Sequence, residues 1–408
     1  MLKQTMTELT KVHTTELFEG IFDAKSYQET IKKLILTEDD EASYSVLIEG
    51  SDPPEEVIHD ALEAQKLLKQ KKKAWGPSFS KKEDEPELLK DENIVQKMET
   101  LAKELQKKYP SVTLKEFRHR SAKKGTILAS GEDEVSQWSR QQEVSIVLDT
   151  REDDKVETLW KSFYIHDLSE LESLLEESFE EVSNLLHGKS IHYGKTKVLL
   201  SSHAAGELLG SYASVFYSDV QRRKGSKFQD REGSVVASSL ITLTDRPHQG
   251  PFMRTVDDEW QETKDHVLIK EGVLQKSLTN LEDHGGGSGY RTNLSPSTEV
   301  KAVHLEMDPG ETPLEELQSD VIYITQWEGL FAGTNPASGD FSLQSKGFAF
   351  RDQKKIPLKG ILVSGNFYDL LKDIEALSKE RTLSSYGGVS LEIPALLIKE
   401  LSVIGEEK

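Results

Sequence analysis

The chain has 408 residues, of which 36% are hydrophobic and 30% are charged, and its formal net charge is −20. This length exceeds what one hydrophobic core normally serves, so two or three domains are expected. A surface this acidic repels phosphate backbones, which argues against nucleic acid as a partner. The sequence has no cysteine, and this excludes disulfides, thiol nucleophiles and every zinc site that uses a thiolate.

No run of eighteen apolar residues occurs, so no segment is expected to cross a bilayer as a helix. The N-terminal sequence MLKQTMTELT also lacks the apolar core of a secretory signal. We therefore expect a cytoplasmic protein with no membrane partner.

The first predicted helix follows Ser51-Asp52-Pro53-Pro54, because Ser or Asp can cap a helix whose first turn holds proline. Apolar residues then recur at helical spacing from Val57 to Leu68. Residues 74–90 are charged and interrupted by prolines, so we expect an exposed linker there.

A second amphipathic helix is predicted from about Asp91 to Tyr109, where Pro110 ends it. Strand-like patterns follow at 112–117, 143–148 and 160–165. A capping box at Ser169-Glu170-Leu171-Glu172 then begins a helix that ends at Gly188.

An apolar strand is predicted at 197–201, followed by a helix from Ser202 to about Tyr217. Beyond Val235 strands dominate, beginning with a hairpin over 266–274. Further strands are expected at 300–307, 320–326, 347–350, 360–363 and 396–403, with one late helix near 368–379.

These patterns predict an α+β fold, in which an N-terminal α/β region with an antiparallel sheet and helices precedes a mostly β C-terminal domain. The expected units are an atypical N-terminal α/β segment, a linker, a central α/β domain and the C-terminal domain, at 1–73, 74–90, 91–230 and 231–408.

Seven segments of the second half have distinctive sequences: KVLLSSHAAGELL (197–209), LTDRP (243–247), VLIKEGVLQKSL (267–278), NPASGDFS (335–342), GFAF (347–350), GILVSGN (360–366) and PALLIKELSVIG (394–405). In this order they resemble the TldD/PmbA family, also called modulator of DNA gyrase. The NPASGDFS segment is similar to the NPVSGDFS segment of the PmbA branch.

This resemblance implies a strand followed by a site helix, which in the catalytic TldD branch carries HExxxH, with a later cysteine as a third zinc ligand. Such a site needs imidazoles that converge on the metal and a glutamate base beside the bound water. Here His203 stands at the first histidine, Ala204 at the base and Leu208 at the second histidine. We therefore predict a degenerate metal motif, with no catalytic residue, no metal and no cofactor.

One arrangement would restore a metal site. His203 and Glu207 are four residues apart and would lie on one face of a helix. A third ligand would then have to come from His248, His284 or His304. A helical His–Glu pair without metal is the more common outcome.

The glycine-rich segment Gly285, Gly286, Gly287 and Ser288 precedes Asn293, and the family has a comparable stretch. Glycine lets a backbone approach another chain closely, so these residues are candidates for contact with an extended peptide. The alternative is a flexible surface loop. The segment lacks the Lys-Ser/Thr of a P-loop.

The family-motif turn contains Asn335, Ser338, Gly339 and Asp340. Because no GxSxG motif is present, we expect a tight turn whose Asp accepts backbone hydrogen bonds, rather than a serine hydrolase site. Trp260 stands where the family commonly has glycine, so the local turn there is expected to differ.

By the same resemblance, TldD and its PmbA/TldE partner form a heterodimer that receives extended peptides. We expect a non-catalytic TldE/PmbA-like subunit that pairs with a TldD-like zinc metalloprotease acting on unfolded peptides, in peptide maturation or protein turnover. Two alternatives stay open, a stand-alone homodimeric peptide-binding protein of the same fold and an active metallopeptidase with a non-standard site.

Overall fold

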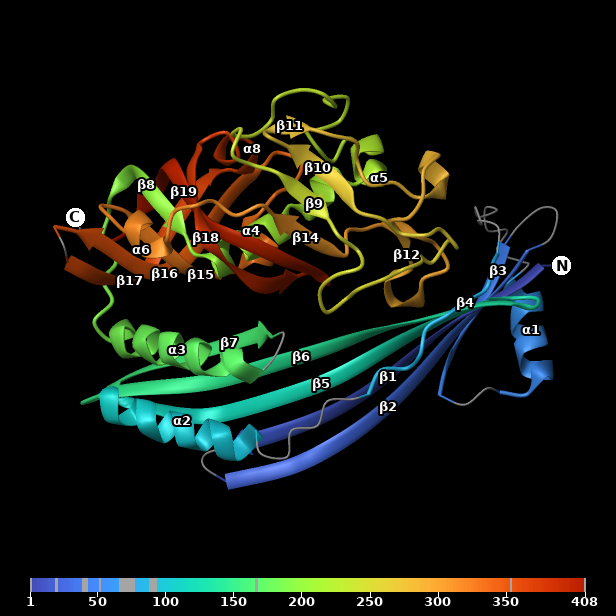
Figure 1. The fold of residues 1–408 in the computed structure, drawn as a ribbon, viewed down its shortest axis with the longest axis horizontal. Coiled ribbons are helices and arrows are strands. Elements are labelled where there is room, and N and C mark those ends of the chain that lie inside the picture. Colours follow the sequence, from blue (N-terminus) through green and yellow to red (C-terminus); the bar gives the residue numbers. More distant parts are fainter. Residues whose placement is uncertain are drawn as a thin grey trace.

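A computed structural model describes residues 2–18, 21–38, 43–50, 53–65, 78–87, 94–165, 168–352 and 354–406. Several predictions lie outside these residues, namely the helix start at Ser51-Asp52, both ends of the linker 74–90 and the helix start at Asp91. Two large sheets organise the described chain, and the long curved strands of the first lie beneath the second in Figure 1.

The first sheet has seven strands in the order β3-β2-β1-β5-β6-β4, and β7 also pairs with β6. Every pairing is antiparallel except the short pairing of β4 with β6. The strands are β1 (Leu2–Phe18), β2 (Ile21–Glu38), β3 (Ser43–Glu49), β4 (Lys81–Lys82), β5 (Val112–Ser130), β6 (Asp133–Glu152) and β7 (Lys155–Tyr164). The strands predicted at 112–117 and 143–148 are therefore only parts of β5 and β6.

Strand β6 buries opposite faces in its two halves. Its buried residues are odd-numbered before Arg140 and even-numbered after it. Successive side chains of a strand point to opposite faces, so each half packs against a different neighbour. Val135 joins a cluster with Trp260 from the second half of the chain, whereas Ile146 joins a cluster with two helices. One long strand thus contributes to both hydrophobic clusters.

Three helices cover parts of the first sheet: α1 (Glu55–Gln65), α2 (Ile94–Lys108) and α3 (Leu171–Leu185). The apolar faces of α2 and α3 share one cluster with β5, β6 and β7. Helix α2 ends before Pro110, as predicted. Helix α3 follows a 3-10 turn, η2 (Leu168–Glu170), and its N-cap residue Glu170 makes no side-chain capping bond. Helix α3 therefore begins one residue later than a cap at Ser169 predicts.

The second sheet has ten strands in the order β11-β10-β9-β14-β19-β17-β16-β15-β8, with β18 on β19. Strand β8 pairs with both β15 and β19, and this closes β8, β15, β16, β17 and β19 into a ring. The strands are β8 (Gly194–Leu200), β9 (Leu243–Asp245), β10 (His266–Lys270), β11 (Val273–Leu274), β14 (His304–Met307), β15 (Ile322–Glu328), β16 (Asp340–Arg351), β17 (Lys354–Asn366), β18 (Ile374–Tyr386) and β19 (Val389–Ile404). A separate two-stranded sheet joins β12 (Gly289–Tyr290) and β13 (Glu299–Val300).

The predicted hairpin over 266–274 is confirmed by β10 and β11. Its turn residues Glu271 and Gly272 have φ values of 48° and 80°. Positive φ at both central residues is typical of the type I′ turn that joins paired strands.

The late helix predicted near 368–379 is wrong. A single short helix, α8 (Phe367–Leu370), is followed directly by β18. Strand β18 pairs with β19 from Ile374 to Tyr386, and this pairing overrides the local helical pattern. The helix expected to reach Tyr217 likewise ends early, as α4 (Ser202–Ser211) followed by η3 (Ala213–Phe216). The other short helices are α5 (Ser218–Arg222), η4 (Leu281–Asp283), η5 (Thr292–Leu294), α6 (Leu314–Leu317) and α7 (Leu330–Gly333).

The sheets group the chain differently from the four units expected at 1–73, 74–90, 91–230 and 231–408. Strands β1 to β3 belong to the same sheet as β5 to β7, because β1 pairs with β5 along most of its length. Strand β8 and helix α4, expected in the central unit, pack in the core of the second sheet. Such long-range pairing leaves no trace in local sequence patterns.

The α+β fold class predicted from the sequence is confirmed, with an antiparallel sheet and helices before a mostly β region. Within the described residues, no helix combines the length and apolar character needed to cross a membrane.

Candidate functional site

Helix α4 carries the degenerate motif. Its N-cap is Ser201, whose Oγ accepts a hydrogen bond from the Ala204 N–H at 3.1 Å. The helix packs closely on β18, since a Cβ on Gly206 would lie 2.1 Å from Ser384 Oγ. Ala204 and Leu208 are both buried in the core of the second sheet. The two positions that would carry the base and the second histidine therefore hold packing residues.

His203 is the one motif residue with a metal-binding side chain. Its Nε2 lies 3.5 Å from Glu207 Oε1, and both side chains are about a quarter exposed, at 27% and 24%. The buried Nδ1 of His203 has no hydrogen-bond partner among the residues that the structure describes. The imidazole also lies against the ring of Phe163 on β7, with 6.2 Å between ring centroids. A helical His–Glu pair is present, as the sequence allowed.

These two side chains open into a cavity of about 450 Å³ between the sheets, which we call the site cleft. One wall comes from Trp160, Lys161 and Tyr164 on β7, and the other comes from 325–327 on β15 and 383–385 on β18. Sequence reasoning missed the β7 residues, because strand patterns alone do not bring that strand beside helix α4.

Polar contacts hold the floor of the site cleft together. Lys161 pairs with the buried Glu181 of α3, and Thr325 Oγ1 donates to Glu181 Oε1 at 3.0 Å. Trp160 is 61% exposed at the same cavity. The cleft thus offers an exposed aromatic side chain beside a fixed charged pair.

The residues at the motif do not fit zinc. Within the part of the chain that the structure describes, no group of three or more His, Cys, Asp or Glu side chains is placed to hold a metal ion. The three possible third ligands are engaged or placed elsewhere. Nε2 of His248 lies 3.1 Å from the Thr263 carbonyl oxygen, His304 contacts Ser390, and His284 ends the turn η4.

The glycine-rich loop uses its own amides inside the protein. The Gly286 N–H donates to Thr279 Oγ1 at 3.2 Å, and the Gly287 N–H donates to Asp257 Oδ2 at 2.9 Å. The Gly285 N–H donates to the backbone carbonyl of Asn280. Peptide contact by Gly285, Gly286, Gly287, Ser288 and Asn293 stays a prediction.

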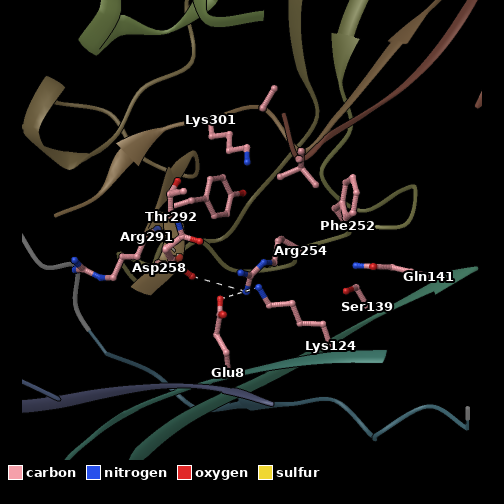
Figure 2. Close-up of a pocket in the computed structure, with 15 residues that line it drawn as sticks. Glu8, Lys124, Ser139, Gln141, Phe252, Arg254, Asp258, Arg291, Thr292 and Lys301 are labelled. Carbon is pink, nitrogen blue, oxygen red and sulfur yellow. Dashed lines mark hydrogen bonds and ion pairs between the residues drawn. The ribbon is translucent and has the colours of Figure 1, made fainter. Parts of the chain in front are cut away.

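Ser288 is buried, and its carbonyl oxygen accepts from the Lys301 N–H at 3.0 Å. Asn293 has a φ of 53° and lines a second cavity together with Arg291 and Thr292 (Figure 2). The structure therefore brings part of the predicted peptide-contact set to a cavity other than the site cleft.

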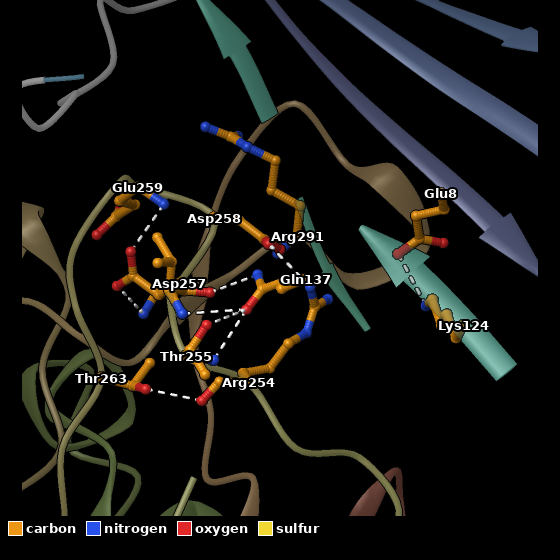
Figure 3. A network of polar contacts seen from close by, with 12 residues as sticks. Glu8, Lys124, Gln137, Arg254, Thr255, Asp257, Asp258, Glu259, Thr263 and Arg291 are labelled. Atoms are coloured by element: carbon orange, nitrogen blue, oxygen red, sulfur yellow. Dashed lines mark hydrogen bonds and ion pairs between the residues drawn. The ribbon is translucent and has the colours of Figure 1, made fainter. Parts of the chain in front are cut away.

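A buried acidic segment organises this loop (Figure 3). Asp257 accepts four backbone hydrogen bonds, from Glu259 and Gln261 at Oδ1 and from Gly287 and Gly289 at Oδ2, all between 2.9 and 3.0 Å. Sequence reasoning missed this role. The available signal was a run of three acidic residues directly before an apolar tryptophan.

The acidic segment is also joined to the first sheet. Gln137 on β6 donates to the Val256 carbonyl at 2.7 Å and accepts from the Val256 N–H at 3.0 Å. Trp260 has a φ of 65°, which is the region that glycine favours, and its side chain is buried in the cluster around Val135. Burial of the large side chain offsets the strained backbone at a position where the family commonly has glycine.

The family-motif turn is a tight turn between α7 and the start of β16, where Asp340 pairs with Asn366 at the end of β17. Asn335 Oδ1 accepts from the N–H groups of Ala337 and Ser338 at 3.1 and 3.2 Å. Gly339 has a φ of 83°, and Asp340 Oδ1 accepts from Asn366 Nδ2 at 2.8 Å. The side chains that accept backbone hydrogen bonds in the turn are thus those of Asn335 and Ser338, and not that of Asp340 as the sequence predicted.

Two buried carboxyl groups make stability depend on pH. Burial raises the pKa of Asp245 and that of Asp257 to about 7, partly offset by their backbone N–H donors. Between an unfolded pKa near 4 and the native value, the native state binds more protons than the unfolded state. Their contribution is therefore present below pH 4 and is lost as the pH rises through 7.

We expect the thermal unfolding midpoint to fall by about 5 °C between pH 5.0 and pH 7.5. Asp245→Asn keeps an acceptor for the N–H groups of Val303 and His304 and should remove roughly half of that decrease. Differential scanning calorimetry at the two pH values measures both. A midpoint that rises with pH, or an unchanged dependence in the variant, would contradict the assignment.

A family model described as the PmbA/TldA metallopeptidase C-terminal domain matches residues 193–405. The chain is 23% identical over 265 residues to a protein of Saccharolobus solfataricus named zinc metalloprotease TldD homolog. The match covers 59% of this chain and 59% of that protein. It is 26% identical over 212 residues to a metalloprotease TldD homolog of Haemophilus influenzae, covering 46% of this chain and 43% of that protein. The chain thus spans less than two thirds of these relatives.

Solved structures share the fold over nearly the whole chain. TldE from Thermococcus kodakarensis superposes with a TM-score of 0.86 at 18% identity, covering 99% of this chain and 97% of that one. A candidate modulator of a DNA gyrase from Thermotoga maritima superposes with a TM-score of 0.82 at 22% identity, covering 98% and 96%. With the family model matching more than half of its residues, this chain belongs to the PmbA/TldD metallopeptidase family.

Proposed function

We propose that this protein is a non-catalytic, TldE/PmbA-like subunit that pairs with a TldD-type zinc metalloprotease and helps it to bind unfolded peptides. The observation that carries the proposal is the composition of α4, where Ala204 and Leu208 are core residues and only His203 retains a ligand side chain. A metal-activated water needs several converging ligands and a base, and the residues that the structure describes do not place them together.

The site cleft supports a role in peptide binding. Strand β7 pairs only with β6 within the described residues, so its other edge is unpaired there, and its side chains line the cleft. An extended peptide can add to a free strand edge through backbone hydrogen bonds, with side chains held in flanking pockets. Trp160, exposed at this edge, offers an apolar contact surface.

The experiment is co-expression with a metalloprotease of the same family that carries HExxxH. We expect the two chains to co-purify, a denatured peptide to be cleaved only by the pair, and about one zinc per heterodimer. His203→Ala in this chain should leave the zinc content unchanged, whereas alanine at the first motif histidine of the metalloprotease should abolish zinc binding and cleavage.

Two outcomes would favour the alternatives. Stoichiometric zinc together with cleavage by this chain alone would indicate an active metallopeptidase with a non-standard site. A stable homodimer that binds peptide but never associates with a metalloprotease would indicate a stand-alone binding protein. Size-exclusion chromatography with light scattering and metal analysis distinguishes these cases.

A further inference from the structure

The second cavity has a volume of about 290 Å³ and lies between β1, β5 and β6 of the first sheet and the loops of the second half (Figure 2). We call it the basic pocket. Its charged lining comprises Glu8, Lys124, Arg254, Asp258, Arg291 and Lys301, and the apolar side chains of Phe252, Ala302 and Val303 complete the wall.

Cations outnumber carboxylates in the basic pocket, although the whole protein is strongly acidic. Lys124 is paired with Glu8 at 2.8 Å. The guanidinium of Arg291 points away from the centre of the pocket and donates a hydrogen bond to the Pro296 carbonyl. Lys301 has no ion-pair partner within the described residues, and burial, together with the nearby Lys124 and Arg254, lowers its pKa.

Asp258 does not neutralise Arg254 fully. Its Oδ2 accepts from the Arg291 N–H at 2.7 Å, and its Oδ1 lies 3.8 Å from Arg254 Nη1, too far for a hydrogen bond. Asp258 Oδ1 and Arg254 Nη1 are both buried, and neither has a hydrogen-bond partner among the described residues. Three side-chain cations, Lys124, Arg254 and Lys301, therefore line the pocket with two carboxylates, those of Glu8 and Asp258, and Glu299 lies near Lys301 outside the lining.

Two buried donors in the pocket lack acceptors. Tyr290 is only 7% exposed, and among the described residues neither its hydroxyl nor Arg254 Nη1 has a hydrogen-bond partner. The Arg254 guanidinium lies 5.9 Å from the Tyr290 ring centroid. A buried donor without an acceptor is unfavourable because it has lost its hydrogen bond to water, so such donors generally serve a ligand or an ordered water. Gly388 leaves room beside the third donor, because a Cβ there would lie 2.7 Å from Lys301 Nζ.

The basic pocket adjoins the site cleft. Tyr164 lines the cleft and Phe252 lines the pocket, and their rings meet edge to face with centroids 5.4 Å apart. A peptide extended along the cleft can therefore place one end or one side chain beside Phe252. The group best matched by guanidinium, ammonium and phenol donors together is a carboxylate.

We propose that the basic pocket binds a carboxylate of the peptide that lies in the site cleft, with Arg254, Lys301 and Tyr290 as its donors. This inference rests on the peptide-binding part of the proposed function and adds a preference for acidic or C-terminal residues. A peptide offers this group in two ways, as its C-terminal carboxylate or as an Asp or Glu side chain.

The test uses Gly/Ser/Ala octapeptides labelled at the N-terminus with an uncharged BODIPY dye that has no free carboxylate, together with the full chain, and fluorescence anisotropy is the readout. One peptide has a free C-terminus, one has a C-terminal amide, and one has the amide and a single Glu. We expect at least one carboxylate peptide to bind about tenfold more tightly than the neutral amide, because a charge-assisted pair with buried donors contributes more than 1 kcal/mol. The carboxylate peptide that binds more tightly shows whether the pocket takes a C-terminal carboxylate or a Glu side chain.

Variants of the pocket should reduce that preference and leave the neutral peptide unaffected. Tyr290→Phe removes a hydroxyl that has no partner among the described residues, so folding should be unchanged while the preference falls about threefold to tenfold. Lys301→Met should have a similar effect. Lys270→Met, at an exposed position on β10, is the matched control for loss of one positive charge.

Equal binding of charged and neutral peptides, or an unchanged preference in both pocket variants, would overturn the inference and leave the proposed subunit role intact. Full competition by 10 mM inorganic phosphate would instead assign the pocket to small anions in general and would also overturn it. Absence of any peptide binding would refute it as well, whereas pairing with a metalloprotease is decided separately by co-purification and cleavage.

Discussion

Asp257→Ala is expected to lower the free energy of unfolding by about 4 kcal/mol, because several buried backbone donors lose their acceptor at once. The carboxylate accepts from four N–H groups, two in its own segment and two in the glycine-rich loop. Water cannot replace it easily, since Asp257 is fully buried. The measurement is urea-induced unfolding followed by tryptophan fluorescence, which Trp260 three residues away should report directly.

The matched control is Asp308→Ala, which removes an exposed carboxylate and should change the free energy of unfolding by less than about 0.5 kcal/mol. Asp257→Asn keeps one acceptor oxygen and should lie between the two. A loss of under 1 kcal/mol in Asp257→Ala would show that the loop holds its shape without this carboxylate.

Gly347→Ala should destabilise the second sheet by about 3 kcal/mol, which is the upper range for overpacking. Gly347 lies on β16 where β15 passes close to it, and a Cβ there would lie 1.9 Å from the Tyr323 backbone oxygen. A strand backbone cannot move aside as a side chain can, so the pairing of β15 with β16 must shift. Loss of soluble expression, or a lower urea midpoint in a protein that still folds, is the expected result.

Gly360→Ala is the comparison for this variant. Gly360 has a φ of 62° and nothing within 4 Å of the added Cβ, so the cost is backbone strain alone, about 1 kcal/mol. Equal stability of the two variants would mean that the close approach of β15 and β16 does not limit the second sheet.

Local patterns predicted those features that depend on neighbours in sequence. Helix α2 and the hairpin of β10 and β11 follow from periodicity and from turn residues such as Gly272. The late helix failed, because β18 acquires its structure from pairing with β19. The same limit applies to β1, whose partner β5 begins more than ninety residues after it ends.

For the candidate site, too, some features follow from the local sequence and others only from the tertiary structure. The sequence by itself placed His203, Ala204 and Leu208 on a strand-to-helix segment, and the chemistry of these residue types determines how few metal ligands that segment can supply. Only the tertiary structure decided that β7 forms the opposite wall of the cleft. It also decided that Asp257 is a buried acceptor and not a solvated acid.

The physical reason is that the identity of a side chain fixes which bonds it can make, whereas burial and partners depend on strands and loops far away in the chain. Tyr290 and Lys301 are unremarkable in the sequence. Their significance arises because folding places them, with Arg254, around one cavity beside the first sheet.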